Sequence, residues 1–476
     1  MTITTYTPAV QVLLTKMVAR VKGVASRYAA TPRQIDITPY LGDAGAIRTV
    51  KSILEPAGGF SISFADATDP TIEDSLYALI EPQDMVEIRS SRTPFKYAGQ
   101  KLPLIMRGLV SSIRRTEGIG PDGKPRRLVV VQGQDFGKLW MINQVYFESA
   151  IVTDKPYIDQ FQLNVTIGLL PSLMPANNYM TFLAEKVMNE KISMMAHFSS
   201  QVVKPFMVDA SVPDGQVFPQ QGGSFSGRTM WDLASMFADR PWNELFIEDH
   251  EDGPHLVFRP TPYYDINGKL IIHGAVDPGV IEMDISAVVN LDLMRSDARV
   301  ANFYWVPPGT GMLDTTFISN VSSLYSSQLD LKYGNDSPEL YGIRKMVCDT
   351  RLLPNNPDSL PSMLPPSEQA PANGDIVLWY QQRAIQLRDM NRDNSVFEEG
   401  SATVMGSEDL KAGRYLRVTR GDLVSRNYIT RVAHTIVPLR TWTADLTLIR
   451  GDGFLGRIDY AGSPAAAEGR KGPYSA

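Results

Sequence analysis

The sequence predicts a mainly β protein of the α+β class, with two antiparallel β-barrel-like units, helical insertions and a second unit that is discontinuous along the chain. Three observations support this prediction. Apolar residues alternate with polar ones in 32–140, which is typical of half-buried strands. Helical spacing of apolar residues replaces that pattern in 141–200. Strand-like alternation returns in 228–306 and again in 400–456.

These changes of pattern divide the chain into seven segments. They are an N-terminal arm (1–31), a first β-barrel unit (32–140), a mainly helical insert and linker (141–227), the first part of a second β-barrel unit (228–306), a Pro-rich insertion and helix (307–399), the closing strands of the second unit (400–456) and a flexible tail (457–476).

The N-terminal part is predicted element by element. Apolar residues near helical spacing over 8–22 favour a short amphipathic arm. Strands of the first unit are predicted at 35–37, 60–66, 85–91, 104–116 and 126–133. Between them, Thr71 to Asp74 is a plausible capped start for a short helix that contains Leu76 and Leu79.

Helices and strands alternate in the rest of the chain. A helix is predicted over 181–195, and the Pro, Gln, Gly and Ser residues of 201–227 favour a long loop or an extended connection. Thr229 to Asp232 is expected to open another helix. Later elements are predicted strands at 242–249, 255–263, 280–297 and 298–306, a helix at 375–394, and C-terminal strands at 401–406, 414–420, 427–437 and 441–451.

Composition excludes several classes of protein. The chain has 476 residues, 43% apolar and 21% charged, which is ordinary for a globular protein able to bury a large core. Its one cysteine, Cys348, excludes an internal disulfide framework or a multi-cysteine metal site and fits a reducing cytoplasm. The formal charge of −6 argues against a nucleic-acid binder held by a basic patch. Neither a transmembrane helix nor a signal peptide is predicted.

One loop partly matches a phosphate-binding motif. Gly118 to Lys124 satisfies GxxxxGK, but the motif next needs a Ser or Thr hydroxyl for magnesium and the start of a helix. Pro125 occupies that position and a predicted strand follows, so we interpret the loop as a hairpin turn. The flanking basic residues are interpreted as exposed hairpin charge; they are Arg114, Arg115, Arg126 and Arg127.

The segment from Asp249 to His255 concentrates residues that can ligate metals. A metal site needs side chains that converge, whereas residues that alternate along a turn usually diverge. The Asp-Gly-Pro sequence between two predicted strands favours a solvated turn over a metal site.

No arrangement typical of catalysis emerges. The chain has no GxSxG motif, and no histidine lies near Cys348 in sequence, although the fold could bring one close. Of the histidines at 197, 250, 255, 273 and 434, His434 alternates with apolar neighbours, as a structural strand residue does. The pair Glu398 and Glu399 is one of many, and sequence cannot show the separation that glycoside chemistry requires. No catalytic, cofactor-binding or metal residue is therefore assigned, and no cofactor is expected.

Motifs in 60–140 resemble the first barrel of bacteriophage baseplate hub proteins. They are Glu81-Pro-Gln-Asp-Met-Val-Glu-Ile88, Arg107-Gly-Leu-Val110 and Gln132-Gly-Gln-Asp-Phe-Gly-Lys-Leu139. Further along, residues 229–248, 294–306, 341–346 and 413–451 are similar to later parts of these proteins in the same order. The resemblance covers roughly 32–456, and no repetitive β-helix follows residue 456.

The resemblance implies a structural, non-enzymatic component of a contractile tail. Hub proteins of this family carry two related barrels per chain and form homotrimers, so that six barrels make a pseudo-hexameric ring. The implied partners are the tail tube protein and the central spike protein, with tape measure and baseplate wedge proteins as further candidates. DNA would pass through the ring without specific binding. The implied location is the tail baseplate of the virion after assembly in the host cytoplasm, without a membrane anchor.

Two alternatives stay open at this stage. One is a tail-associated cell-wall hydrolase, for which 141–200 and 307–375 are the segments that could hold an active site. The other is a hub or spike-core protein of a phage-derived contractile injection or secretion system, which the sequence does not distinguish from a phage hub.

Overall fold

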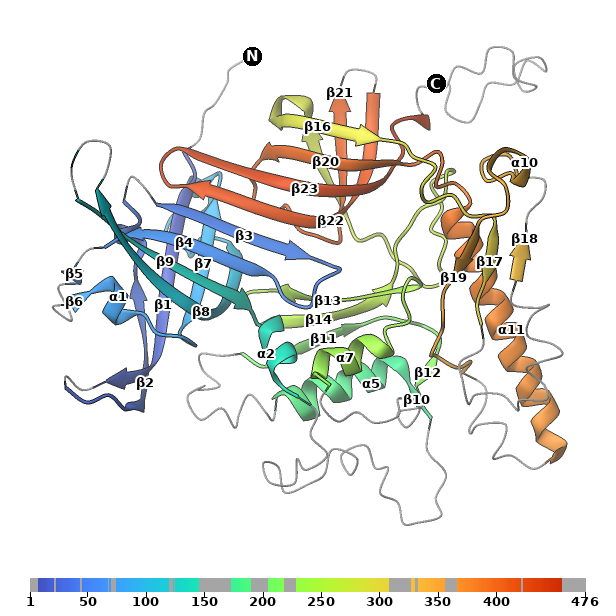
Figure 1. Ribbon diagram of the computed structural model, residues 1–476, viewed down its shortest axis with the longest axis horizontal. Coiled ribbons are helices and arrows are strands. Elements are labelled where there is room, and N and C mark those ends of the chain that lie inside the picture. The colour runs from blue at the N-terminus through green and yellow to red at the C-terminus, as the bar shows by residue number, and fades with distance from the viewer. Residues whose placement is uncertain are drawn as a thin grey trace.

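The structure is a computed structural model in which strands predominate (Figure 1). It describes residues 7–20, 23–42, 45–66, 68–69, 74–119, 123, 125–144, 173–189, 204–217, 228–307, 327–329, 333–355, 366–420 and 423–455. Within these ranges most strands pair antiparallel and the helices are few, so the predicted mainly β fold of the α+β class is confirmed. The tail at 457–476, most of 141–200 and part of the Pro-rich insertion lie outside the described residues.

Thirteen strands form one large sheet. They are β1 Ala9–Arg20, β2 Arg27–Asp36, β3 Ala46–Ser52, β4 Gly59–Ala65, β7 Met85–Ser91, β8 Leu104–Ile119, β9 Pro125–Asp135, β15 Val280–Asp284, β16 Val288–Met294, β20 Glu398–Met405, β21 Tyr415–Arg420, β22 Leu423–Val437 and β23 Thr441–Gly451. Their order is β16-β20-β23-β22-β3-β4-β9-β8-β7-β1-β2, and β21 pairs with both β22 and β15 beside this path.

The remaining elements lie between these strands along the chain. The strands are β5 Thr68–Asp69, β6 Asp74–Ser75, β10 Met174–Pro175, β11 Met207–Ala210, β12 Gln216–Val217, β13 Asn243–Asp249, β14 Pro254–Pro260, β17 Phe303–Trp305, β18 Ser327–Leu329 and β19 Lys345–Val347. The helices are η1 Thr38–Leu41, α1 Leu76–Leu79, η2 Pro94–Tyr97, α2 Gly137–Ile142, α5 Ala176–Phe182, η3 Leu183–Met188, α7 Met230–Met236, η5 Ile285–Ala287, α10 Pro338–Tyr341 and α11 Pro366–Asn391.

Two regions of the large sheet each enclose a hydrophobic core. The inner faces of β1, β3, β4, β7, β8 and β9 contribute to one cluster, which includes the fully buried Ile62, Phe64 and Ile88. The C-terminal strands and β15 enclose a second cluster around Tyr415 and Leu446. Because several consecutive strands share each core, the sheet must curve around it, which is the property expected of barrel-like units.

Strands β3 and β22 join these two regions. Ile47 of β3 lies opposite Ile436 of β22, and Val50 lies opposite Ala433. Strand β22 is long enough to pair with β21 through its first half and with β3 through its second half. Strand β3 is not among the predicted strands, yet it makes the two units parts of one sheet.

The N-terminal prediction is wrong in its secondary structure. Residues 9–20 form β1, which pairs with β7 on one side and β2 on the other, rather than an amphipathic helix. Val12, Leu13 and Leu14 are all buried in succession, because both faces of β1 are covered at this point. A strand buried on both faces loses the period of two that distinguishes strands from helices in sequence.

A small sheet and several helices form further layers below the large sheet (Figure 1). Strand β14 pairs antiparallel with β13 and parallel with β11. Leu245 and Ile247 of β13 pack in a cluster with α2, α5, η3 and α7, whereas Phe246 between them packs with the C-terminal strands. This alternation places the small sheet between the helices and the large sheet.

This layering corrects two predictions. Residues 201–227 are not only a loop, because β11 and β12 lie within them. Residues 228–306 divide among three sheets, because β13 and β14 belong to the small sheet, β15 and β16 pair with the C-terminal strands, and β17 pairs with β18 and β19. All of these strands contain apolar residues, so local pattern does not show which partner each strand takes. The assignment of domains stays a prediction.

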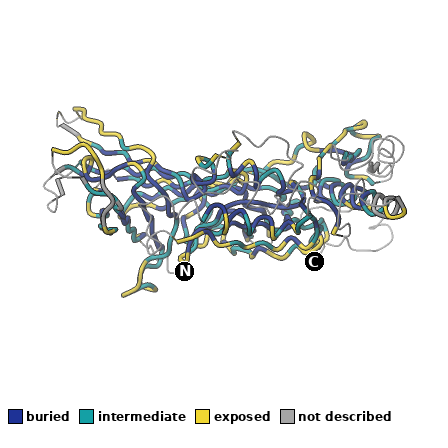
Figure 2. Tube along the Cα trace, turned by 90° about the horizontal axis from the view of Figure 1, so that it is seen from below, coloured by how far each residue is buried: buried dark blue, intermediate teal, exposed yellow. Residues whose placement is uncertain are grey.

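Helix positions are partly as predicted. Thr229 and Asp232 form the capping box that opens α7. Helix α1 is capped by Ser75 rather than by Thr71, which lies outside the described residues. Helix α11 begins at Pro366, earlier than the predicted start at 375, and packs with Tyr304 and Trp242 in a fourth core cluster. No helix in the described part of the chain is long and apolar enough to cross a membrane. Buried residues run along most of the elongated molecule (Figure 2).

Candidate functional site

The residues that carry the hub resemblance form a buried charged junction between the large and the small sheet. Glu87 of β7 accepts hydrogen bonds from Arg89 Nε and from Arg107 Nε on β8, each at 3.0 Å. All three side chains are at most 8% exposed. A buried carboxylate between two guanidinium groups balances part of their charge, which makes the ion pairs mutually dependent.

The junction holds the turn between β13 and β14. Arg89 donates to both carboxylate oxygens of Glu251, at 2.7 and 2.8 Å, and Arg107 donates to the backbone carbonyl of His250 at 3.2 Å. Such bidentate pairs fix geometry as well as charge. The hydrogen bonds from Arg89 hold the pKa of Glu251 below its usual value, although partial burial opposes them.

A second motif residue, Asp135 of β9, is connected to the end of β13 through Lys51. Its carboxylate binds Lys51 of β3 and accepts from the backbone N–H groups of Gly58 and Gly137, both at 2.8 Å. Lys51 also lies 3.5 Å from Asp249 at the end of β13. Burial alone lowers the pKa of Lys51, but the two carboxylates outweigh it and raise the pKa. Burial raises the pKa of Asp249 to about 6.

The other charged motif residues also contact the protein itself. Asp84 accepts from Lys16 at 2.9 Å and from the backbone N–H of Glu81 at 2.8 Å. Lys138 donates to the hydroxyl of Ser111 at 3.0 Å. The motifs therefore specify contacts that hold strands and layers together, and no nucleophile paired with a base occurs among them.

The structure brings together two residues of the acidic turn that sequence reasoning expected to diverge. His250 and His255 face each other across the hairpin, with ring centroids 4.2 Å apart. Asp209 of β11 completes a group whose ligand atoms all lie within 4.8 Å of one another. The residues converge because they come from neighbouring strands rather than from successive positions along one turn. Sequence gave no signal for Asp209, because its strand pairs with β14 over a long separation.

The loop with the partial phosphate motif is a hairpin connection, as predicted. Strands β8 and β9 flank it, and Ile119 is paired with Pro125. No helix begins after the loop. Arg115 pairs with Asp66 and Glu117, both at 2.9 Å, and Arg127 lies 3.7 Å from Glu117.

The remaining candidate residues are not arranged for catalysis. Cys348 lines a cavity with Arg299 and Arg450, and no histidine is among the described residues that line it. Burial and two nearby carboxylates raise the pKa of its thiol, which disfavours a reactive thiolate. Glu399 pairs with Arg299 at 3.1 Å. His197 lies outside the described residues.

His434 is a buried structural residue, as its strand position predicts. Its Nδ1 accepts a hydrogen bond from Trp442 Nε1 at 3.1 Å. Burial lowers the pKa of His434 to about 4, so the ring is neutral at pH 7. His273 is exposed and contacts Asp214 at 3.1 Å.

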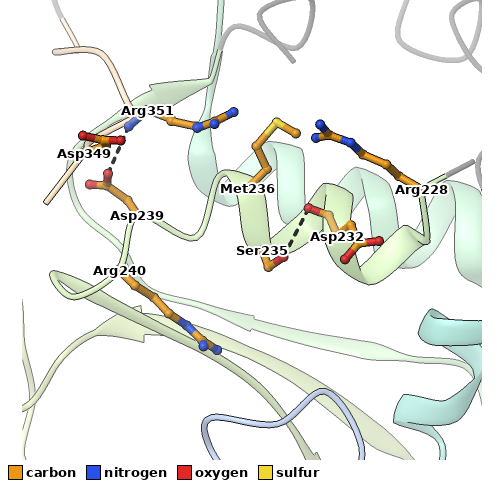
Figure 3. A pocket seen from close by; sticks show the side chains of 8 residues that line it. All are labelled: Arg228, Asp232, Ser235, Met236, Asp239, Arg240, Asp349 and Arg351. Atoms are coloured by element: carbon orange, nitrogen blue, oxygen red, sulfur yellow. Dashed lines mark hydrogen bonds between the residues drawn. The ribbon is translucent and has the colours of Figure 1, made fainter. Parts of the chain in front are cut away.

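A polar cavity of about 480 Å³ lies beside α7 (Figure 3). Arg228 and Arg351 extend from opposite sides toward Met236, while Asp239 accepts from the backbone N–H of Arg351 at 3.2 Å. Arg240 donates to the backbone carbonyl of Leu245 at 2.9 Å. Asp239 and Arg240 are thus bound to the surrounding protein rather than directed together at a common point in the cavity.

The two ends of the large sheet differ in chemistry. Strand β2 pairs only with β1 among the described strands, and it carries Pro32 and the exposed Arg33. Proline and charge are typical of edges that avoid further pairing. Strand β16 pairs only with β20 among them, and it exposes Val289 (66%) and Met294 (58%) beside the polar Asn290 and Asp292. A strand edge with free backbone groups and exposed apolar side chains is suited to contact another protein.

No protein-family model matches this chain, and no curated protein matches its sequence. Among solved structures, a tail protein from Neisseria meningitidis MC58 is similar with a TM-score of 0.49 and 11% identity, over 93% of this chain and 97% of that one. The 43 kDa tail protein of prophage MuSo2 from Shewanella oneidensis has a TM-score of 0.45 and 12% identity, over 92% and 98%.

A component of the type VI secretion system of E. coli is also similar, with a TM-score of 0.39 and 9% identity over 85% of this chain and 73% of that one. It is described as structurally similar to the T4 bacteriophage tail proteins gp27 and gp5. All three are tail or tail-related proteins, the class that the motifs of this sequence also resemble. TM-scores below 0.5 are too low for the likeness to establish a function.

Proposed function

We propose that the chain is a structural subunit of a phage tail baseplate, and that it forms a homotrimeric hub. The observation that carries the proposal is the placement of the resembling motifs. The segments 81–88, 107–110, 132–139 and 413–451 all contribute to one sheet, and the first three also supply Glu87, Arg107 and Asp135 to its charged contacts. Several motifs that occur in the order seen in hub proteins and contribute to one sheet support a hub-like fold more strongly than any single motif does.

In the proposed ring, each copy contributes its two barrel-like regions, so three copies present six similar units to a hexameric tube. A closed ring requires a contact between different surfaces of neighbouring copies. We assign the β16 edge to this contact, because it exposes Val289 and Met294 where β2 exposes charge. The net charge of −6 suits a ring through which DNA passes, since clustered basic residues would retain it.

The mass of the purified full-length protein tests the proposal. Mass photometry over a range of concentrations is expected to show a species of three times the 52.7 kDa chain mass. The double variant Val289→Lys and Met294→Lys is expected to shift the population to monomers, because it places charge in a desolvated contact. A wild-type protein that stays monomeric, alone and with tube and spike proteins of the same phage, would contradict the proposal.

The matched control is Leu340→Lys. Leu340 is 74% exposed on α10, which lies outside the large sheet, so its replacement is expected to leave the trimer intact. Thermal unfolding of each variant shows whether the fold is retained. A zymogram on cell-wall substrate tests the non-enzymatic part of the proposal, and reproducible clearing by the purified protein would favour the hydrolase alternative.

A further inference from the structure

The strand register places four ionisable side chains on one face of the small sheet. His255 of β14 lies opposite Glu248 of β13 and opposite Met207 of β11. Residues directly opposite each other share a face, and so do residues two apart on one strand. Asp209 therefore shares the face of Met207, and His250 extends the face of Glu248.

Distances confirm that these side chains converge. His255 Nδ1 lies 2.8 Å from Asp209 Oδ2, and one ring nitrogen of His250 belongs to the same group, whose ligand atoms lie within 4.8 Å. The His255 side chain is 12% exposed and that of His250 is 33% exposed, whereas Asp209 is 53% exposed, so the two histidines are partly shielded and the carboxylate faces water.

Each histidine also has a carboxylate at its other side. His255 Nε2 lies 3.1 Å from Asp252 Oδ1. His250 Nε2 is buried, has no hydrogen-bond partner among the described residues and lies 3.5 Å from Glu248 Oε1. The contact with the His250 ring, together with Lys411 at 2.7 Å, holds the pKa of Glu248 well below its usual value despite burial. Histidines that ligate metals commonly donate their second ring nitrogen to a carboxylate in this way.

We propose that Asp209, His250 and His255 bind a divalent transition-metal ion, with zinc as the best fit. Two imidazole nitrogens and one carboxylate oxygen are ligands that zinc prefers, and three protein ligands leave one position for water. His255 would bind through Nδ1 while Asp252 accepts from its Nε2. Small side-chain movements suffice, because zinc ligands lie about 2.0–2.2 Å from the ion and hence roughly 3.5 Å from one another.

The site would link two strands and one turn. Asp209 belongs to β11, His255 to β14, and His250 closes the turn that Arg107 and Arg89 hold against the large sheet. Binding to the folded state alone would raise stability by mass action. This role does not depend on the oligomeric state, so the site can be tested separately from the proposed hub function.

Metal content and thermal stability of the full-length protein test the proposal. After treatment with a chelator and dialysis against zinc, the wild type is expected to retain one zinc ion per chain by mass spectrometry of the metal. Its melting temperature is expected to rise on zinc addition. His255→Gln and His250→Gln are expected to lose both effects while melting cooperatively without metal. Cobalt in place of zinc is expected to give the visible absorption of a four-coordinate ion.

Two further variants keep the test sharp. His273→Gln removes an exposed histidine that contacts Asp214 outside the group, so zinc uptake is expected to be unchanged. Asp252→Asn leaves the three ligands and is expected to weaken binding about 10–100-fold. Failure of the wild type to bind zinc, or binding that His255→Gln leaves unchanged, would overturn the proposal.

Discussion

Two hairpin turns in this chain looked similar in sequence and have different surroundings in the structure. The β8–β9 connection partly matches a phosphate-binding motif, yet Ile119 beside it is 81% exposed and its nearest described ion pairs involve residues of the same hairpin or Asp66. The β13–β14 turn matches no motif, yet Glu251 binds Arg89, a residue that is only 1% exposed.

The difference shows that the surroundings of a turn determine its role. Strand β8 is largely buried in its first half and largely exposed in its second half, so the β8–β9 turn lies away from the core. The β13–β14 turn instead lies against the large sheet, where the buried guanidinium of Arg89 needs a partner, and Glu251 provides one although its own side chain is 61% exposed.

Removing the charge of Glu87, the carboxylate that Arg89 and Arg107 share, is expected to have the largest effect on stability. Glu87→Gln leaves Arg89 and Arg107 buried with less compensating charge, and the free energy of unfolding is expected to fall by about 3–5 kcal/mol. Glu117→Gln in the exposed hairpin is expected to change it by less than about 0.5 kcal/mol. Urea denaturation measures both, and equal effects would show that the junction is no more important than the hairpin.

The turn itself contributes less than the carboxylate beneath it. Glu251→Ala removes two charge-assisted hydrogen bonds to Arg89, and a loss of about 1.5–3 kcal/mol is expected. Arg127→Ala, which removes a 3.7 Å pair between exposed side chains, is expected to cost about 0–1 kcal/mol. Thermal unfolding measures the stability of both variants. A larger loss of stability for Arg127→Ala than for Glu251→Ala would contradict the prediction.

Each turn contains a glycine with positive φ, which allows a matched backbone test. A Cβ at Gly253 (φ 152°) would lie 3.0 Å from Lys204 Cβ and from the Pro205 carbonyl oxygen, whereas nothing lies within 4 Å at Gly123 (φ 71°). Gly253→Ala is expected to cost about 2–3 kcal/mol and Gly123→Ala about 1 kcal/mol. Chemical denaturation measures the free energy of unfolding of both variants. Equal losses would mean that the β13–β14 turn has room for the added methyl group and would contradict this prediction.

The pH dependence of stability that Glu251 causes is expected to be the smallest of these effects. Because the pKa of Glu251 is lower in the folded state, its contribution is present above its usual pKa and is lost as the pH falls through the folded value. The melting-temperature difference between wild type and Glu251→Gln is therefore expected to shrink as the pH falls from about 6 to 3. A difference that grows toward acid would contradict the assigned sign.

Local signals predicted many elements correctly. The Thr229 and Asp232 capping box depends on neighbouring residues alone, and it opens α7 as expected. The C-terminal strand β23 alternates clearly because one of its faces is buried more than the other. Strand β3 escaped prediction because Arg48 and Lys51 interrupt its apolar residues, and Asp135, the partner of Lys51, lies far away in sequence.

The candidate sites were less predictable for the same physical reason. Glu87, Arg107 and Asp135 were noticed as parts of motifs, but their mutual contacts depend on strand pairing that no local pattern specifies. His250 and His255 were noticed but expected to diverge. They converge because cross-strand neighbours share a face. The third member, Asp209, comes from β11, in a segment predicted to be a long loop or an extended connection.

Single-particle cryo-EM of the purified full-length protein, alone and with the tail tube protein of the same phage, tests the central claim most directly. The proposed hub predicts closed rings of three chains, with six similar β regions around a lumen and β16 at the contact between copies. Particles that contain only one chain under both conditions, or rings in which β16 faces solvent, would contradict it.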